Sequence, residues 1–481
     1  MHQNKTKELL YNTVVFAVGG FGSKILNYFL IPLYTIYLST AEYGTADLLT
    51  STISMIIPLL SLCMGHAVLR FVLGKSENRQ TALLLVFAIT LGGLIFLFLL
   101  YPFLNRVSAY QGYAWYLPLL FFVSALHTIL GSYCKAIEKN KTLAFDGIIA
   151  SVSQTVLSLL FIAVWKLGVD GYLSALLISR LISVLYFVIT CRIWREFSGK
   201  PTFHKQVAKE MVQFSTPLIP GDLSWWVIQM SDRYMLVFLC GAAINGLYSM
   251  AYKIPGIFNI IVSVFTASFS ITAIKEYENG EEKNGKLDGS YLALVYRKYL
   301  MITFLAVSAL VLLTRPIASV FFKKDFYAAW IYVPLLLCAF TIGNLQAFYE
   351  SIVVGLKKTR LCFFATFGGA IINVILNLIL IPRYSAYGAA ISTAISYLAV
   401  YIIKVIGCIK YVEMNHHFGM ITASLFLVLL ISTLYMQGKL ITDCVCVLLF
   451  GVLILLYWKE IVETFKYLYC AIRNLAGKSM E

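Results

Sequence analysis

Apolar runs of 18 or more residues recur along this 481-residue chain, and they constrain its fold more than any other feature. Hydrophobic residues make up 60% of the chain and charged residues only 13%, whereas an ordinary soluble domain has about 25% charged residues. Water therefore cannot be the main solvent. In hydrocarbon each backbone polar group must be satisfied within its own segment, so the runs must be helices. The sequence predicts an all-α polytopic membrane protein.

A hydropathy window of about 19 residues places about fourteen transmembrane helices. They lie near 11–38, 44–70, 82–104, 115–134, 142–165, 171–191, 213–240, 243–270, 297–314, 328–352, 361–381, 387–406, 418–436 and 440–458. The first run is too long for a signal peptide and lacks a cleavage site, so we expect it to be a retained span.

The basic residues gather at alternate loops between these spans. They lie at the N-terminus, from Arg70 to Arg79, Lys135 to Lys141, Arg192 to Lys209, Lys275 to Lys298 and Lys357 to Arg360, at Lys404 and Lys410, and in the tail from Lys459. Because cytoplasmic loops carry the excess of Lys and Arg, both termini are predicted to be cytoplasmic. The net charge of +15 thus reflects the Lys and Arg residues of the cytoplasmic loops and does not indicate a nucleic-acid partner.

Three pairs of segments match in the same order along the chain, which indicates an internal repeat. AEYGTADLLTS aligns with AINGLYSMAYK and places Gly44 on Gly246, and two further pairs align Thr142 with Thr359 and Gly171 with Gly388. We expect six-helix lobes within 1–200 and 201–412, related by an axis along the membrane normal, and an extra helix pair with a cytoplasmic tail within 413–481. The polar loop Lys275–Arg297 is interpreted as a solvated linker.

Ionisable residues near the middle of a span cost roughly 2.5–3.5 kcal/mol each on insertion scales, so they need a cavity or a partner. Lys24 lies near the middle of the first span and Arg180 near the middle of the sixth. No span end is near either residue. We therefore expect both side chains to line a cavity.

Polar and aromatic residues recur at helical spacing in the seventh span and predict a second part of that cavity. They are Asp222, Trp225, Trp226, Gln229, Asp232 and Arg233, and the eighth span continues the pattern with Asn245, Ser249, Lys253, Gly256, Asn259 and Ser263. An intramembrane ion pair, or snorkelling from a nearby span end, accounts equally well for Asp47, Asp146, Arg233 and Glu350.

Signatures of catalysis and of metal binding do not occur in the sequence. It has no phosphate-binding loop, no nucleophile elbow, no large loop with paired carboxylates, and no metal-ligand spacing among its six His. We therefore expect no enzymatic activity, metal or cofactor. The ten Cys contain no C-x-x-C pair and are interpreted as small buried apolar residues.

Three segments resemble bacterial polysaccharide repeat-unit flippases of the Wzx type, within the multidrug/oligosaccharidyl-lipid/polysaccharide (MOP) exporter superfamily. They are NTVVFAVGGFGSKILNYFLIPLYTIYLSTAEYGTADL, SDRYMLVFLCGAAINGLYSMAYKIP, and GLKKTRLCFFATFGGAIINVILNLILIP with the following YGAAISTAIS. The similarity extends over nearly the whole chain. Its motifs are packing and turn patterns, which specify the superfamily better than the substrate.

The resemblance implies two six-helix lobes in a V around a central cavity, alternating access, and a bacterial cytoplasmic (inner) membrane location. The implied substrate is a sugar repeat unit on undecaprenyl pyrophosphate, moved from the cytoplasmic to the outer leaflet for surface polysaccharide assembly. Membrane lipid and polysaccharide polymerase or assembly proteins are the implied partners. Lys24 occupies a place comparable to a headgroup-binding basic residue of the related lipid II flippases, although Ile25 follows it here rather than an acid.

Basic groups suit a pyrophosphate and aromatic rings suit sugar faces. The expected substrate-binding residues are Lys24, Arg180, Lys253, Arg233, Asp222, Trp225, Trp226, Gln229 and Tyr252. The main alternative is a cation-coupled small-molecule (multidrug) exporter of the same superfamily. Coupling to an H⁺ or Na⁺ gradient stays open.

Overall fold

The computed structural model describes residues 28–198, 202–260, 282–283 and 286–464, together with residues 262, 265, 269 and 466. Contacts divide the chain into two compact units. Unit 1 comprises residues 1–250 with the segments 320–327 and 377–386, and unit 2 comprises the other residues from 251 onward. The expected lobe boundaries at residues 200 and 412 stay a prediction.

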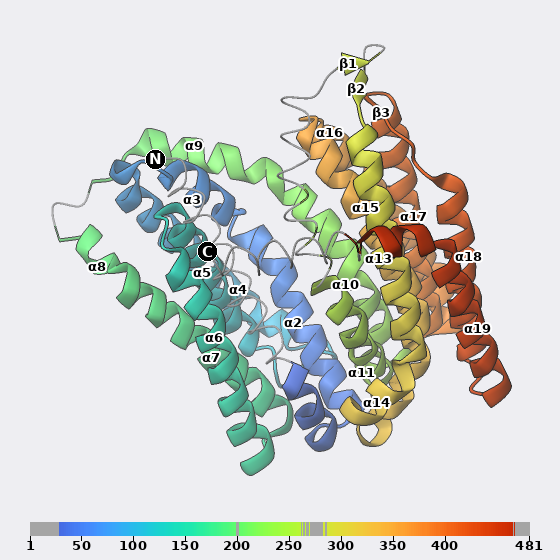
Figure 1. The fold of residues 1–481 in the computed structure, drawn as a ribbon. Coiled ribbons are helices and arrows are strands. Elements are labelled where there is room, and N and C mark those ends of the chain that lie inside the picture. Colours follow the sequence, from blue (N-terminus) through green and yellow to red (C-terminus); the bar gives the residue numbers. More distant parts are fainter. Residues whose placement is uncertain are drawn as a thin grey trace, which may run out of the picture. The chain divides into compact units, whose positions relative to one another are not determined.

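Unit 1 is built from packed α-helices. They are α2 (Thr40–Leu60), α3 (Met64–Val72), α4 (Arg79–Leu104), α5 (Tyr116–Ala136), α6 (Asn140–Ser158), α7 (Gly168–Cys191), α8 (Ile193–Glu196), α9 (Lys205–Ser215), α10 (Ile219–Cys240) and α11 (Ala242–Ala251). Ser76–Asn78 and Thr216–Leu218 form short 3₁₀ helices, and Leu159–Val164 continues α6 as a π-helix. Helix α5 packs against α3, α4 and α7, and α2 packs against both α5 and α10 (Figure 1).

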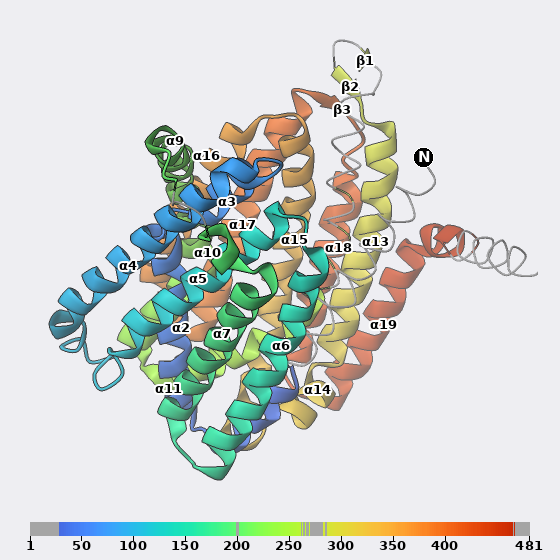
Figure 2. The ribbon, with the colours of Figure 1, turned by 90° about the vertical axis from the view of Figure 1, so that its left-hand side faces the viewer.

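Unit 2 contains the remaining helices and a small sheet. They are α13 (Ser290–Leu312), α14 (Thr314–Phe321), η4 (Lys324–Tyr332), α15 (Val333–Gly355), α16 (Thr359–Tyr384), α17 (Ala386–Ile409), α18 (Phe418–Tyr435) and α19 (Leu440–Leu456), with β1 (Glu282–Lys283), β2 (Lys286–Asp288) and β3 (Val412–Glu413). Parts of α14, η4, α16 and α17 fall in the segments that belong to unit 1. The extra pair α18 and α19 packs on α13 (Figure 2).

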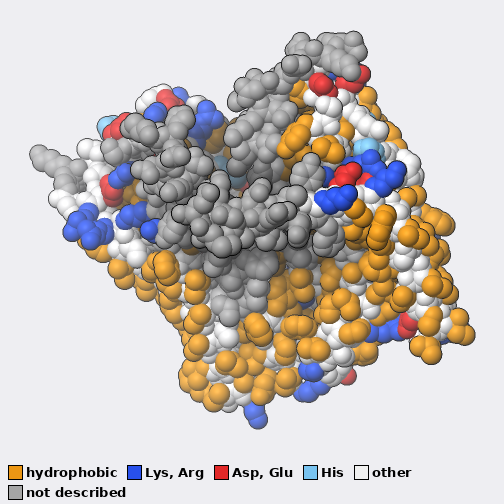
Figure 3. Space-filling model, in the orientation of Figure 1, with side chains coloured by type: hydrophobic (Ala, Val, Ile, Leu, Met, Phe, Trp, Pro, Cys, Tyr) orange, Lys and Arg blue, Asp and Glu red, His pale blue; other side chains and the backbone are white. Residues whose placement is uncertain are grey.

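Ten helices in the described ranges are long and apolar enough to cross a membrane, and α19 with its bent continuation makes an eleventh. The other three expected spans are the first and eighth, which lie partly outside the described residues, and the seventh, α10, which carries three charged residues. Figure 3 shows hydrophobic side chains over broad areas of the described surface, with Lys and Arg side chains in separate groups. The chain is a polytopic α-helical membrane protein, as the sequence predicts.

The second expected span, 44–70, is two helices rather than one. A capping box formed by Ser39 and Glu42 starts α2, which contains Pro58 and ends at Leu60. Leu62 and Cys63 then adopt left-handed backbone conformations, with φ of 53° each, before α3 begins. Proline removes a helical hydrogen bond, and two consecutive left-handed residues cannot continue a right-handed helix. The span is therefore broken near residue 62.

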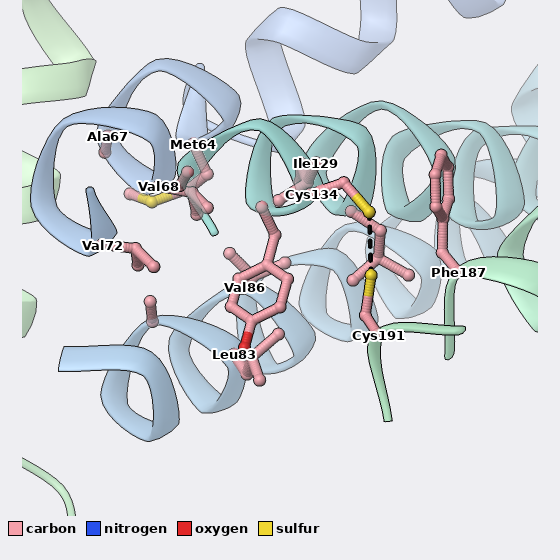
Figure 4. Close-up of a cluster of buried hydrophobic side chains, with 14 of the residues drawn as sticks. Met64, Ala67, Val68, Val72, Leu83, Val86, Ile129, Cys134, Phe187 and Cys191 are labelled. Atoms are coloured by element: carbon pink, nitrogen blue, oxygen red, sulfur yellow. Dashed lines mark hydrogen bonds between the residues drawn. The ribbon is translucent and has the colours of Figure 1, made fainter. Parts of the chain in front are cut away.

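A core of unit 1 lies where α3, α4, α5 and α7 meet (Figure 4). Phe187 and Met64 are fully buried in this cluster. Cys134 and Cys191 face each other within it, with their sulfur atoms 2.8 Å apart. Both are small residues that fill the space between α5 and the end of α7, as expected. Cys444 differs from the expectation, because it is exposed.

Helices α2 and α11 approach each other closely at two glycines that the repeat alignment pairs. A Cβ atom on Gly44 would lie 1.9 Å from the carbonyl oxygen of Ala242, and a Cβ atom on Gly246 would lie 1.9 Å from the carbonyl oxygen of Thr40. The contact is reciprocal, because Thr40 and Ala242 each precede their glycine by four residues. Equivalent positions of the two segments thus meet each other, and only glycine fits at either.

Within the expected linker Lys275–Arg297, residues 282–283 and 286–288 form strands and α13 starts at Ser290, which differs from its interpretation as a solvated linker. Strand β2 pairs with β1 in an antiparallel register and with β3 in a parallel register, so Leu287 lies opposite Val412. Leu287 and Val412 are buried. The linker therefore packs against the segment between α17 and α18.

Lys404 also differs from expectation, since the charge pattern places it in a cytoplasmic loop. It lies within α17 and is fully buried. Its Nζ donates to Oε1 of Gln346 at 2.5 Å and to Oε2 of Glu350 at 3.1 Å. Glu350 thus has the intramembrane ion pair that the sequence left as an alternative, and Lys404 carries no information on topology.

We predict that Gly44→Ala and Gly246→Ala each destabilise the protein by about 1–3 kcal/mol or more, because a backbone carbonyl cannot move aside as a flexible side chain can. The measurement is the thermal midpoint of the purified protein in detergent. Gly92→Ala in α4 is the matched control, since nothing lies within 4 Å of its Cβ position. Equal midpoints for all three variants would contradict the close contact.

Candidate functional site

A cavity of about 580 Å³ lies among α2, α5, α6 and α7, inside unit 1. Ligand pockets commonly measure about 300–1,000 Å³. Its lining is mixed in polarity. The polar side chains of the lining come from Thr50, Ser54, Ser124, His127, Thr128, Ser132, Lys135, Asp146, Tyr172 and Arg180. The structure therefore places Arg180, one of the two residues expected in a cavity, at the wall of one.

Arg180 is held in the cavity by a chain of polar contacts. Its Nη1 donates to Nδ1 of His127 at 3.2 Å, and Nε2 of His127 lies 2.9 Å from Oδ2 of Asp146. A guanidinium group can only donate, so Nδ1 must accept and the ring proton must sit on Nε2, where it is donated to the carboxylate. The neutral histidine thus links Arg180 to the carboxylate of Asp146 through two hydrogen bonds and orients the guanidinium group.

The charge balance of the cavity favours an anion. Arg180 and Lys135 contribute two positive charges to the lining, and Asp146 contributes one negative charge. Oδ1 of Asp146 is buried and has no hydrogen-bond partner among the residues that the structure describes. A membrane interior strengthens the attraction between the net positive charge and an anionic group.

The stripe on α10 splits into a buried part and an accessible part. Nε of Arg233 lies 3.3 Å from Oδ2 of Asp47, and its Nη1 donates to Oγ of Ser51 at 3.1 Å. Oγ of Ser249 donates to the same Asp47 oxygen at 2.6 Å. Arg233 therefore forms the ion pair that the sequence left as an alternative, and it does not belong to the cavity lining. Its expected role in substrate binding stays a prediction.

The other residues of the α10 stripe have separate surroundings. Nε1 of Trp226 donates to the carbonyl of Ser51 at 3.0 Å and to Oγ of Ser54 at 3.1 Å, so this ring lies next to a cavity-lining residue. Oδ2 of Asp222 lies 3.6 Å from Nε2 of His66, beside the break between α2 and α3. Gln229 is exposed.

The remaining expected site residues are not among the residues that line the cavity. Trp225 is half-buried on α10. Tyr252 and Lys253 belong to unit 2, where the ring of Tyr252 packs against Phe340 at 5.3 Å between centroids. Lys24 lies outside the described residues.

Sequence reasoning missed His127 and Lys135, which a stripe on α5 could have revealed. The cavity-lining residues of this helix are Ser124, His127, Thr128, Gly131, Ser132 and Lys135. Counted from Ser124, the other five follow after three, four, seven, eight and eleven residues. That spacing places them on one helical face. The stripe contains only one charged residue, so a search for intramembrane charges overlooks it.

The sequence matches a protein family and one individual protein. A sequence-family model described as "Polysaccharide biosynthesis protein" matches residues 9–271. An uncharacterised membrane protein of Methanocaldococcus jannaschii is 20% identical over 286 residues, a match that covers 56% of this chain and 65% of that protein. The chain thus spans less than two thirds of that relative.

Solved structures of transporters share the fold at low sequence identity. The lipid II flippase MurJ in an inward closed conformation matches with a TM-score of 0.69 and 16% identity, covering 93% of this chain and 100% of MurJ. A MATE family transporter of the MOP superfamily in an inward-facing conformation matches with a TM-score of 0.63 and 14% identity, over 81% of this chain and 93% of the transporter. A MOP superfamily transporter from Pyrococcus furiosus has a TM-score of 0.56 and 13% identity, over 83% and 95% of the two chains.

We predict that the Asp47–Arg233 pair stabilises the fold only as a pair. Removing one partner leaves a buried charge and costs roughly 3–5 kcal/mol, whereas replacing both by apolar residues is close to neutral. Asp47→Leu and Arg233→Met should each lower the stability of the protein in detergent, and the double variant should regain most of the loss. Additive losses in this double-mutant cycle would show that the two side chains act independently.

Proposed function

The chain belongs to the polysaccharide biosynthesis protein family, and from this membership we propose that it is a flippase for lipid-linked oligosaccharides. It moves sugar repeat units on undecaprenyl pyrophosphate from the cytoplasmic to the outer leaflet of the bacterial cytoplasmic membrane, for assembly of surface polysaccharide. Both termini then lie in the cytoplasm, as the distribution of basic residues predicts. The fold shared with MurJ and MATE transporters supports alternating access between two lobes.

The observation that carries this proposal is a cationic side chain on the wall of a polar cavity among membrane-spanning helices. A pyrophosphate-linked sugar is anionic, polar and large, and it must cross about 30 Å of hydrocarbon. Arg180 supplies a charge and up to five N–H donors, of which His127 accepts one. Its other donors can serve phosphate oxygens, to which guanidinium groups bind in a bidentate manner.

The hydroxyl groups around Arg180 suit the sugars next to the pyrophosphate. Ser124, Thr128 and Ser132 follow one face of α5 along the cavity, and Tyr172 presents an aromatic ring from α7. Hydroxyls exchange hydrogen bonds with many sugars, because each can both donate and accept. This lining explains how one cavity accepts a polar headgroup, and it does not select a particular sugar.

The other expected residues complete the proposal. Lys24 and Lys253 supply further positive charge along the path of the headgroup, and Trp225, Trp226 and Tyr252 supply aromatic surfaces for sugar rings. Asp222 and Gln229 add polar contacts on α10. Membrane lipid and the polysaccharide polymerase that uses the translocated units are the proposed partners.

We predict that Arg180→Ala lowers the export of surface polysaccharide by about tenfold to a hundredfold, since a hydrogen bond to a charged group is worth about 1.5–3 kcal/mol. Arg180→Lys should give an intermediate result, because lysine keeps the charge and loses the planar fork. The measurement is polysaccharide on the surface of a strain that carries each variant as its sole copy, normalised to the amount of folded protein in the membrane.

Arg195→Ala is the matched control for Arg180→Ala. Arg195 lies at the end of α8, is exposed, and is not part of the cavity lining. Its removal takes away the same charge at another site and should leave export unchanged. Export at the wild-type level in the Arg180→Ala strain would remove Arg180 from the transport path.

The rival proposal, a cation-coupled multidrug exporter, predicts a different phenotype for the same strains. Deletion of the protein would then raise sensitivity to cationic drugs and leave surface polysaccharide intact. The flippase proposal predicts accumulation of lipid-linked repeat units in the cytoplasmic leaflet of the deletion strain and an unchanged drug sensitivity.

A further inference from the structure

A second polar pocket lies in unit 2, at the turn that joins α15 to α16. Its volume is about 390 Å³. Four of its lining residues are cationic, namely Lys357, Lys358, Arg360 and Lys410, and none of the lining residues is acidic. This strong excess of one charge distinguishes it from the cavity around Arg180.

The backbone holds the four cations in one place. Lys357 follows the end of α15 and adopts a left-handed conformation with φ of 57°. The amides of Lys357 and Lys358 donate to the carbonyls of Val354 and Val353 at 2.9 and 3.1 Å. These bonds fix the turn before α16. Nζ of Lys358 lies 4.7 Å from the ring centre of Tyr411, beyond the end of α17. The turn and the end of α17 are therefore tied together across the pocket.

Gly407 allows the two helices to approach at the base of the pocket. A Cβ atom at this position would lie 2.1 Å from a side-chain carbon of Leu361 in the first turn of α16. Without that atom the first turn of α16 lies directly against α17. Arg360 and Lys410, which flank this contact in sequence, are brought to the same pocket.

The pocket lies beside exposed apolar side chains of two candidate membrane-spanning helices. Phe364 on α16 is 64% exposed and lies one turn beyond Arg360, and Ile406 on α17 is 55% exposed and lies one turn before Lys410. Both helices are long and apolar enough to cross the membrane. The four cations thus stand where apolar, lipid-facing surface ends, which is the depth of lipid phosphates.

We propose that this pocket binds the phosphate group of an anionic phospholipid from the surrounding leaflet. Basic pockets at the cytoplasmic ends of transmembrane helices attract anionic headgroups. The acyl chains then run along the exposed side chains of Phe364 and Ile406. Free phosphate or pyrophosphate shares the same chemistry but gains nothing from this apolar surface, and so the lipid is the ligand that matches both features.

This inference does not depend on the transported substrate. The pocket belongs to unit 2, and the cavity around Arg180 belongs to unit 1. A protein that fails to flip lipid-linked sugars can still bind phospholipid here. The two proposals therefore fail separately.

Native mass spectrometry of the full-length protein in detergent tests the proposal. With added phosphatidylglycerol the wild type should retain bound lipid, and with phosphatidylcholine it should retain much less. Lys358→Gln/Arg360→Gln/Lys410→Gln should weaken phosphatidylglycerol binding by at least about tenfold, because each lost cation removes part of the electrostatic attraction. Lys358→Arg/Lys410→Arg, which keeps the charge, should bind as the wild type does.

The matched control neutralises three exposed basic residues outside the pocket, as Arg195→Gln/Lys205→Gln/Lys209→Gln. It should bind phosphatidylglycerol like the wild type. Equal binding by the pocket variant and this control would overturn the proposal. Displacement of bound phosphatidylglycerol by inorganic pyrophosphate at equal concentration would also overturn it, in favour of a soluble anion. If the triple pocket variant does not fold, the preference of the wild type for phosphatidylglycerol over phosphatidylcholine and the competition with pyrophosphate still decide the proposal.

Discussion

The backbone contact between Gly44 and Gly246 is the constraint on which the rest of unit 1 depends. It brings α2 against α11 at a distance that no side chain would allow. One helical turn further on, Asp47 reaches Ser249 and Arg233, and this buried ion pair connects α2 to α10. Because α2 is fixed in this way, Thr50 and Ser54 on the neighbouring strip of the same helix are held at the wall of the cavity.

Arg233 and Arg180, both within helices of unit 1, have opposite surroundings. Arg233 meets a carboxylate directly, so its charge is largely neutralised within the protein. Arg180 meets a neutral histidine instead, and the carboxylate of Asp146 lies one group further away. Arg180 thus keeps donors and net charge available on the cavity side. This difference separates a residue that holds helices together from one that can bind a ligand.

The fold could be predicted from sequence because hydrocarbon leaves a long apolar run few alternatives to a helix. Spans such as α4 and α7 follow directly from their composition. The position of the break in the second span could not be predicted, since the left-handed conformation of Leu62 and Cys63 has no compositional signal. Lys404 was misplaced because a buried partner on another helix, Glu350, allows a lysine to stay inside a span.

The candidate site was predictable only where a residue is costly to bury without a function. Arg180 lies near the middle of its span, with no span end close to it, and it is part of the cavity wall. Arg233 lies nearer to a span end and forms an ion pair. His127 was missed because a neutral histidine carries little insertion cost and because its partners, Asp146 and Arg180, lie on other helices. Contacts between helices, which decide whether a charge is neutralised, cannot be derived from the spacing within one helix.

The most direct test of this account is transport by the purified protein in vesicles that contain an undecaprenyl-pyrophosphate-linked oligosaccharide. A soluble enzyme outside the vesicles modifies only the sugars in the outer leaflet. We predict that the protein makes the sugars of the inner leaflet accessible to this enzyme, and that replacing Arg180 by alanine slows this step by about tenfold to a hundredfold. If the accessible fraction stays at the level of protein-free vesicles, or is the same with and without Arg180, the central claim is contradicted.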